Sequence, residues 1–188
     1  MSGLLSYSGL TTKIRAMQSH LLNDQNFREI VELESVPQAA AYLKQHKGYE
    51  DLFEGYNETD LHRGQIEKLL RLTVYRDFSK LYRFANVEQR KFLALYFKRY
   101  EVSIIKECLN TVFDHRDVVL NLSMFDEFFK KHSQLDVNLL SSSRTIEELI
   151  ANLKGTEYYV PLSQLADIER PTLFDYEMTL DLFYFAQM

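Results

Sequence analysis

Five histidines and one cysteine are the side chains of this sequence best suited to act as nucleophiles, general bases or metal ligands. The histidines are widely separated and form no His-Glu-x-x-His pair; they are His20, His46, His62, His115 and His132. Cys108 has no histidine on its helical face, so we expect it to be buried and structural. No glycine-rich phosphate loop is present. The residue types therefore predict no catalytic residue, no metal site, no cofactor and no small-molecule ligand.

One local cluster, the run Asp114, His115, Arg116 and Asp117, could hold a metal ion or act in acid–base chemistry. It falls at a predicted helix end, where His and Arg favour the negative end of the helix dipole. We therefore interpret the cluster as a helix terminus.

A buried carboxylate is predicted at Glu101, which lies near the middle of the apolar face of a long helical pattern. Burial removes the hydration of a carboxylate, so a partner is expected. Arg63 and Asp77 fall on the apolar side of the preceding helix. The cation that pairs with Glu101 could be Arg63, Arg99, or an Arg or Lys of another helix. A functional alternative makes Glu101 a proton carrier or general base, but with no catalytic companion the pattern favours a structural ion pair.

The elements that position these side chains are predicted to be helices throughout. The 188 residues include only 6 Gly and 3 Pro, too few for the turns of sandwiches or barrels. Apolar residues recur with helical spacing in several segments, and the capping pairs Ser35/Gln38 and Asn86/Gln89 mark helix starts. The predicted helices cover residues 4–22, 25–33, 35–48, 59–84, 87–113, a short segment from Ser123, and a segment from Thr145 onward. The fold class is all-α.

An internal repeat is predicted, because residues 35–52 align without gaps on residues 145–162. The cap pair Ser35/Gln38 falls on Thr145/Glu148, and the downstream helices keep the same offset. Residues 133–143 lack periodicity and are predicted to be a linker loop. We expect a first helical lobe over 1–132 and the start of a second, similar lobe over 144–188. The apolar final residues lack a helix stop signal, so we expect a fragment or a shortened relative of a longer protein.

The charge and hydropathy of the sequence limit the kinds of partner that the chain can bind. The formal net charge is −5, which disfavours binding to nucleic acid. The 12 Tyr and 13 Phe follow helical spacing and are expected in the core. Apolar runs are far shorter than the roughly 20 residues of a membrane span. A single cysteine is typical of a reducing, intracellular setting.

The sequence resembles the N-terminal part of the C subunits of V-type and A-type ATPases and ATP synthases, which are relatives of the d subunit of eukaryotic V-ATPases. The resemblance spans nearly the whole chain and rests on the order and spacing of several blocks: 7–22, 35–49, 96–106, 146–159 and 180–185. The family-motif positions within them include Tyr49, Tyr96, Phe97, Arg99, Glu101, Lys106 and Tyr159. Two positions depart from the family pattern: Ile104 replaces a frequent Asn, and Asn110 a frequent Arg.

The resemblance implies a funnel-like array of helical lobes and a mechanical, non-catalytic role. Such proteins form a socket between the rotor shaft and the membrane proteolipid ring, so the chain would be cytoplasmic and peripheral to a membrane-bound ATPase that transports protons or sodium ions. Two alternatives remain open. A helical scaffold would bind peptide segments in a groove lined by Tyr and Leu, and an all-helical enzyme would bring Glu101 and His115 together in a cleft.

Overall fold

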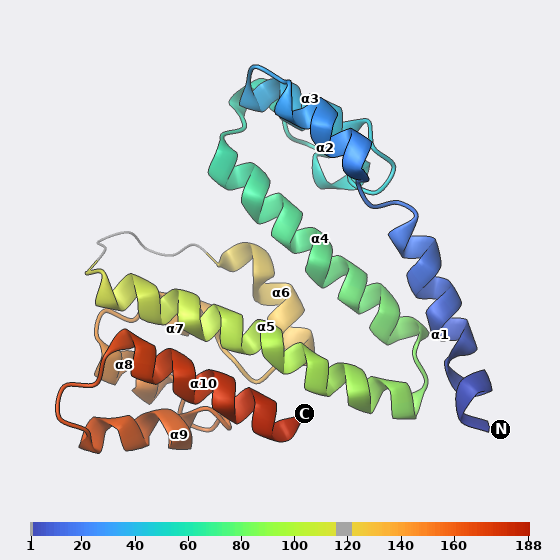
Figure 1. Cartoon of the computed structure of the whole chain (residues 1–188). Helices are drawn as coiled ribbons and strands as arrows, with labels where there is room; N and C mark the ends of the chain where they lie inside the picture. The colour runs from blue at the N-terminus through green and yellow to red at the C-terminus, as the bar shows by residue number, and fades with distance from the viewer. Residues whose placement is uncertain (1, 116–121) are drawn as a thin grey trace. The chain divides into compact units, whose positions relative to one another are not determined.

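The computed structural model describes residues 2–115 and 122–188, and these residues form α-helices, short 3-10 helices and connecting turns without a β-strand (Figure 1). The all-α prediction is confirmed. By their internal contacts the residues fall into two units, Met1–Gln89 and Arg90–Met188. The sequence-predicted boundary at 133–143 lies inside the second unit, and the assignment of repeated lobes stays a prediction.

The first unit consists of helices joined by short turns: α1 (Ser2–Gln18), α2 (Asp24–Val31), α3 (Val36–Lys44), η1 (Glu50–Leu52), η2 (Glu58–Asp60) and α4 (Arg63–Phe84). Helix α1 packs against α4, and α3 packs against both 3-10 helices (Figure 1). Leu43, Phe53 and Leu69 are among the buried side chains of this unit.

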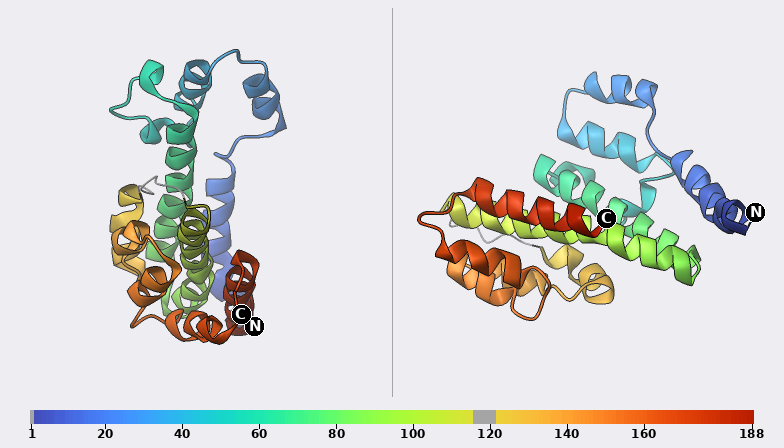
Figure 2. Two further views of the ribbon diagram at one scale, coloured as in Figure 1. Left: turned by 90° about the vertical axis from the view of Figure 1, so that its left-hand side faces the viewer. Right: turned by 60° about the horizontal axis from the view of Figure 1, so that its bottom comes forward.

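The second unit contains most of one long helix and a series of shorter ones: α5 (Val87–Phe113), α6 (Ser123–His132), α7 (Val137–Ser142), α8 (Ile146–Asn152), α9 (Tyr159–Ser163), η3 (Gln164–Asp167) and α10 (Leu173–Gln187). The two longest of these, α5 and α10, run side by side in opposite directions (Figures 1 and 2). Near one end of the pair the rings of Phe113 and Tyr176 lie 5.7 Å apart. Nearer the other end Lys106 pairs with Asp181 at 2.7 Å.

Helices α3 and α8 begin with the same type of cap. Ser35 Oγ accepts a hydrogen bond from the backbone N–H of Gln38 at 3.4 Å. Thr145 Oγ1 accepts one from the N–H of Glu148 at 3.2 Å. In both helices the N–H of the residue before the cap donates to the side chain of the third helical residue, at 2.9 Å to Gln38 Oε1 and 2.7 Å to Glu148 Oε2. The predicted caps therefore form, and they form alike at both aligned positions.

The next pair of aligned helices, α4 and α10, also begins at equivalent positions. His62 and Thr172 are the N-caps. The N–H of His62 donates to Gln65 Oε1 at 3.2 Å, and that of Thr172 donates to Asp175 Oδ2 at 2.7 Å. The offset found in the sequence thus extends to the local hydrogen bonds of the later helices.

Several predicted helix ends differ from the structure. Helix α1 ends at Gln18 and is followed by turns, and α3 ends at Lys44, before Gly48. Gly48 has another role: a Cβ atom there would lie 2.4 Å from the backbone oxygen of His20, so only glycine allows this approach. A separate 3-10 helix covers Glu58–Asp60, and α4 therefore starts later than predicted.

The prediction of a loop over residues 133–143 is wrong for Val137–Ser142, which form α7. Asp136 caps this helix by accepting the N–H of Leu139 at 2.9 Å. Val137 and Leu140, three residues apart, are fully buried and anchor it. Tertiary burial of two side chains therefore stabilises a helix too short for its periodicity to be read from sequence.

Candidate functional site

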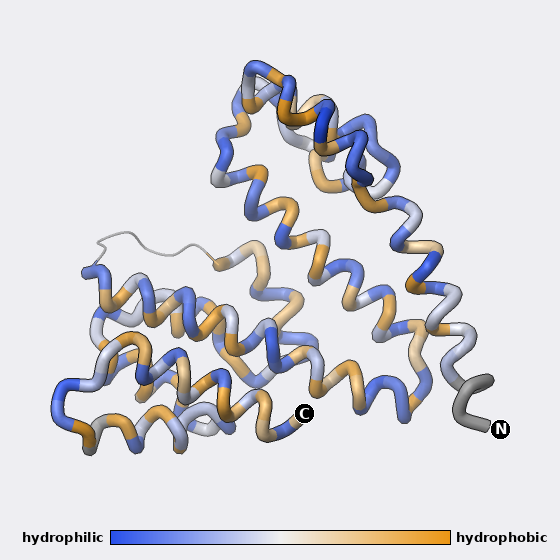
Figure 3. Tube along the Cα trace, in the orientation of Figure 1, coloured by the Kyte–Doolittle hydropathy of each residue, from blue (hydrophilic) through white to orange (hydrophobic). Residues whose placement is uncertain are grey.

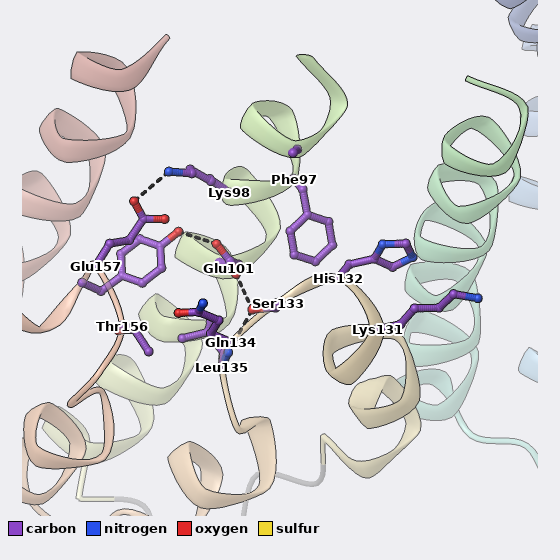
Figure 4. Close-up of a pocket in the computed structure, with 12 residues that line it drawn as sticks. Phe97, Lys98, Glu101, Lys131, His132, Ser133, Gln134, Leu135, Thr156 and Glu157 are labelled. Carbon is purple, nitrogen blue, oxygen red and sulfur yellow. Dashed lines mark hydrogen bonds and ion pairs between the residues drawn. The ribbon is translucent and has the colours of Figure 1, made fainter. Parts of the chain in front are cut away.

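A pocket of about 340 Å³ lies within the second unit. Helix α5 contributes Phe97, Lys98 and Glu101 to its wall, the link between α6 and α7 contributes Ser133, and the turn before α9 contributes Tyr158. Figure 4 shows Glu101 between these segments. Three segments that are distant in sequence therefore meet at this pocket.

Glu101 joins the three segments by hydrogen bonds. The residue is buried, with only 7% of its surface exposed. Tyr158 donates its hydroxyl to Oε2 at 2.6 Å, and the Ser133 hydroxyl donates to Oε1. Ser133 Oγ in turn accepts the N–H of Leu135 at 3.0 Å. Both carboxylate oxygens are thus engaged by donors from within the fold, an arrangement that acts as a cross-link.

Burial shifts the titration of this group. Loss of hydration raises the pKa of Glu101 above its ordinary value, and the hydrogen bonds from Ser133 and Tyr158 oppose that rise. Burial, together with the neighbouring carboxylate of Glu101, also raises the pKa of the Tyr158 phenol. Tyr158 therefore remains a hydrogen-bond donor over the physiological pH range.

A second set of polar contacts lies at the rim of the pocket. Lys98 forms an ion pair with Glu157 at 2.7 Å and also contacts the side-chain oxygen of Gln187. The amide of Gln187 donates to Glu157 at 3.1 Å. These contacts tie the end of α10 to α5 beside the Glu101 cross-link. Figure 4 shows the Lys98–Glu157 ion pair of this set.

An aromatic cluster adjoins the pocket and contributes Phe97 and His132 to its wall. Phe97 is buried, and its ring lies 5.3 Å from that of Phe128, 5.7 Å from that of Phe129 and 5.8 Å from that of His132. Burial lowers the pKa of His132, and the nearby charge of Lys131 adds to the effect. The neutral imidazole is therefore favoured inside this cluster.

Helix α5 separates Glu101 from His115. His115 follows the end of α5, and along a helix the 12 residues from Glu101 to Phe113 span about 18 Å. His115 does not line the pocket; the histidine in the pocket wall is His132. The cleft that the enzyme alternative requires is therefore not formed by Glu101 and His115. Arg116 and Asp117 of the predicted terminal cluster lie outside the described residues.

The cysteine prediction is confirmed, since Cys108 is a free and buried thiol. Burial raises the pKa of the Cys108 thiol to about 12. Within 2–115 and 122–188, no group of three or more His, Cys, Asp or Glu side chains is arranged to hold a metal ion.

The structure corrects the prediction that Arg63 and Asp77 are buried charges. The Arg63 side chain is 85% exposed and pairs with Glu67 at 2.7 Å, one turn along α4. Asp77 is half-buried and pairs with Lys80 at 3.2 Å. A helical wheel assigns residues to the apolar side of a helix, but it does not show along which part of the helix other segments pack against that side. The hydrogen-bond partners of Glu101 are two hydroxyl groups instead of the expected cation, and the nearby charge of Lys98 makes only a minor contribution to its pKa.

The remaining family-motif positions take different places. Arg99 is exposed, whereas Tyr96, Lys106, Tyr49 and Tyr159 are half-buried. The Tyr96 ring contacts that of Tyr100 at 6.0 Å. Lys106 pairs with Asp181 across the α5–α10 pair.

At the two departures from the family pattern, Ile104 is buried and Asn110 donates to Glu177 at 2.9 Å. A polar contact between α5 and α10 is therefore present at Asn110, although the side chain is an amide.

Sequence reasoning missed the two donors of Glu101. Tyr158 precedes the motif position Tyr159 and is the buried member of the pair, at 1% exposure. Ser133 lay in the segment interpreted as a loop. No local pattern shows which of two adjacent tyrosines in a turn is buried. A buried carboxylate needs hydrogen-bond donors, however, and this need makes serine and tyrosine hydroxyls candidates.

The described residues thus form an all-α protein in which a buried carboxylate joins three segments distant in sequence. Residues 10–188 match the family model described as ATP synthase (C/AC39) subunit. The chain therefore belongs to the ATP synthase C/AC39 subunit family. No solved structure matches the chain.

Three relatives illustrate the similarity. The C subunit of the A-type ATP synthase of Methanosarcina mazei is 27% identical over 99% of this chain and 50% of its own length. The corresponding C subunit of Methanosphaera stadtmanae is 25% identical over 97% of the chain and 45% of its own length. That of Pyrococcus abyssi is also 25% identical, over 97% of the chain and 47% of its own length. The chain spans about half the length of these relatives.

Proposed function

We propose that this chain is a non-catalytic central-stalk subunit of a rotary A-type or V-type ATPase. In this role it acts as a socket that couples the rotor shaft to the membrane proteolipid ring during ion transport. The observation that carries the proposal is the family match over residues 10–188. The proposal also places the chain on the cytoplasmic side, peripheral to the membrane complex. Across the described part of the chain, no helix is long and apolar enough to cross a bilayer.

The physical character of the second unit supports a mechanical role. A socket must transmit torque without yielding, and stiffness comes from contacts that link segments distant in sequence. Glu101 connects α5 to Tyr158 and Ser133, and the Lys98–Glu157 and Lys106–Asp181 pairs add links on either side. Because both Glu101 oxygens accept internal hydrogen bonds, the group is better suited to cohesion than to proton transfer to a substrate.

Affinity purification tests the proposal. An epitope-tagged chain is expressed in its native cells, membranes are solubilised in mild detergent, and the purified material is identified by mass spectrometry. We expect the rotor-shaft and proteolipid proteins of one rotary ATPase to co-purify with the chain. An equally expressed tagged cytoplasmic protein is the control. Recovery of the chain without these proteins would contradict the proposal.

A coupling assay tests the socket role more finely. Depleting the chain from cells should reduce ATP-driven ion uptake into membrane vesicles more than it reduces ATP hydrolysis, because a coupling element links the two without catalysing either. Equal loss of both activities, or ATP hydrolysis by the purified chain alone, would argue against a non-catalytic coupling role.

A further inference from the structure

Helix α10 is apolar on two opposite faces. One face is buried in the second unit and includes Tyr176 and Leu180. The other face carries Phe174, Leu182 and Phe185, which are 65%, 62% and 67% exposed. Met178 lies between them and is also exposed. On a helix of 3.6 residues per turn these four side chains form one continuous line, the α10 stripe. Figure 3 shows the apolar residues distributed along this helix.

The aligned helix of the first unit keeps part of the equivalent face away from water. With α4 and α10 beginning at aligned residues, Tyr75 corresponds to Phe185 and Phe78 to Met188. Tyr75 and Phe78 are buried, whereas Phe185 and Met188 are exposed. A continuous exposed apolar patch of this kind marks an interaction surface. The α10 stripe is therefore a contact face.

The charged residues of α10 itself are all acidic. Helix α10 contains Asp175, Glu177 and Asp181 but no Lys, Arg or His. By helical geometry Asp175 borders one edge of the stripe, and Glu177 and Asp181 border the other. Lys106 pairs with Asp181, which offsets one of the three charges. The negative end of the helix dipole adds to the acidic character at the end of α10.

We propose that the α10 stripe binds an amphipathic helix of a partner polypeptide whose apolar face is bordered by lysine or arginine. The exposed line of large side chains supplies the apolar contact, and the acidic residues at its edges attract the lysine or arginine side chains of the partner helix. A second copy of this chain fits less well, because its own acidic edges would lie against those of the first copy. The proposal goes beyond the stalk role and does not depend on it.

Two synthetic peptides of about 18 residues, long enough to cover α10, probe the stripe. Both carry leucine at the same helical positions, but one has lysine at the edges of the leucine face and the other has glutamate. Circular dichroism confirms equal helicity in trifluoroethanol. We expect the whole chain to bind the lysine peptide saturably in fluorescence anisotropy, at least about tenfold more tightly than the glutamate peptide, with an affinity that falls as salt is added.

Variants locate the site. Leu182→Ser with Phe185→Ser should weaken lysine-peptide binding by at least about tenfold. The matched pair Phe27→Ser with Val31→Ser, at exposed apolar positions of α2, should leave binding unchanged. Glu177→Gln with Asp181→Asn should reduce the ratio between the affinities for the lysine peptide and the glutamate peptide. Thermal unfolding confirms that each variant folds.

Three results would overturn the inference. They are equal binding of the two peptides, wild-type binding by the Leu182→Ser, Phe185→Ser variant, and a dimer in sedimentation velocity that this variant abolishes. The last result would assign the stripe to a second copy. None of them bears on co-purification with other ATPase proteins, so the stalk proposal is tested separately.

Discussion

The phenolic hydroxyl of Tyr158 donates a 2.6 Å hydrogen bond to Oε2 of Glu101, a residue 57 positions earlier in the chain. Both residues are buried, at 1% and 7% exposure. The bond joins the middle of the longest helix to the turn before α9, so its removal should be felt in the stability of the whole second unit.

Glu101→Ala should lower the free energy of unfolding by about 2 to 4 kcal/mol, because it leaves the hydroxyls of buried Tyr158 and half-buried Ser133 without their acceptor and opens a cavity. Glu101→Gln keeps the shape and one acceptor, so its cost should stay below about 1 kcal/mol. Tyr158→Phe should fall between them, at about 1 to 2 kcal/mol. Urea unfolding followed by circular dichroism measures all three. A Glu101→Ala cost no larger than that of Glu101→Gln would show that the cross-link contributes nothing to stability.

The stability difference between wild type and Glu101→Gln should depend on pH. Burial raises the pKa of Glu101 in the folded state above the ordinary 4.5. The stabilising contribution of a group with a raised pKa is fully present below its unfolded pKa and is lost as pH rises through the folded pKa. Wild type should therefore lose stability relative to Glu101→Gln from about pH 4.5 upward. Unfolding curves between about pH 4 and pH 8 test this, and a constant difference would contradict it.

Gly48→Ala should destabilise the first unit by about 1 to 3 kcal/mol, because its Cβ would lie 2.4 Å from the backbone oxygen of His20. Gly9→Ala is the matched control. Its Cβ would meet Phe84 only at 3.7 Å, and alanine favours the helix interior, so it should stabilise by about 0.5 to 1 kcal/mol. Opposite signs of the two melting-temperature shifts are expected, and equal effects would show that the close approach is unimportant.

The aligned helix caps should contribute similar stability. Ser35→Ala and Thr145→Ala each remove a side-chain acceptor for a helix N–H and should each cost about 1 kcal/mol. Ser35→Asn and Thr145→Ser preserve an acceptor and should restore most of the loss. Guanidinium unfolding of the four variants provides the measurement, and a cost at only one cap would show that the two helix starts are not energetically equivalent.

Cys108 should not react with a thiol reagent in the folded protein. Burial removes access and raises the thiol pKa to about 12, so thiolate is scarce at neutral pH. A chromogenic disulfide reagent should modify Cys108 rapidly in urea and slowly without it. Rapid modification of the native chain would mean that α5 is open at this position.

Residue types and their spacing were enough to predict the helical class, the span of α5, the caps at Ser35 and Thr145, and the burial of Glu101 and Cys108. These features are local, because a helix start and an apolar face are written in residues three and four apart. The exposure of Arg63, the helical state of α7, and the meeting of Tyr158 and Ser133 with Glu101 emerged from the folded chain alone. Those outcomes depend on which segments distant in sequence pack against one another. The local spacing of apolar residues does not determine these long-range contacts.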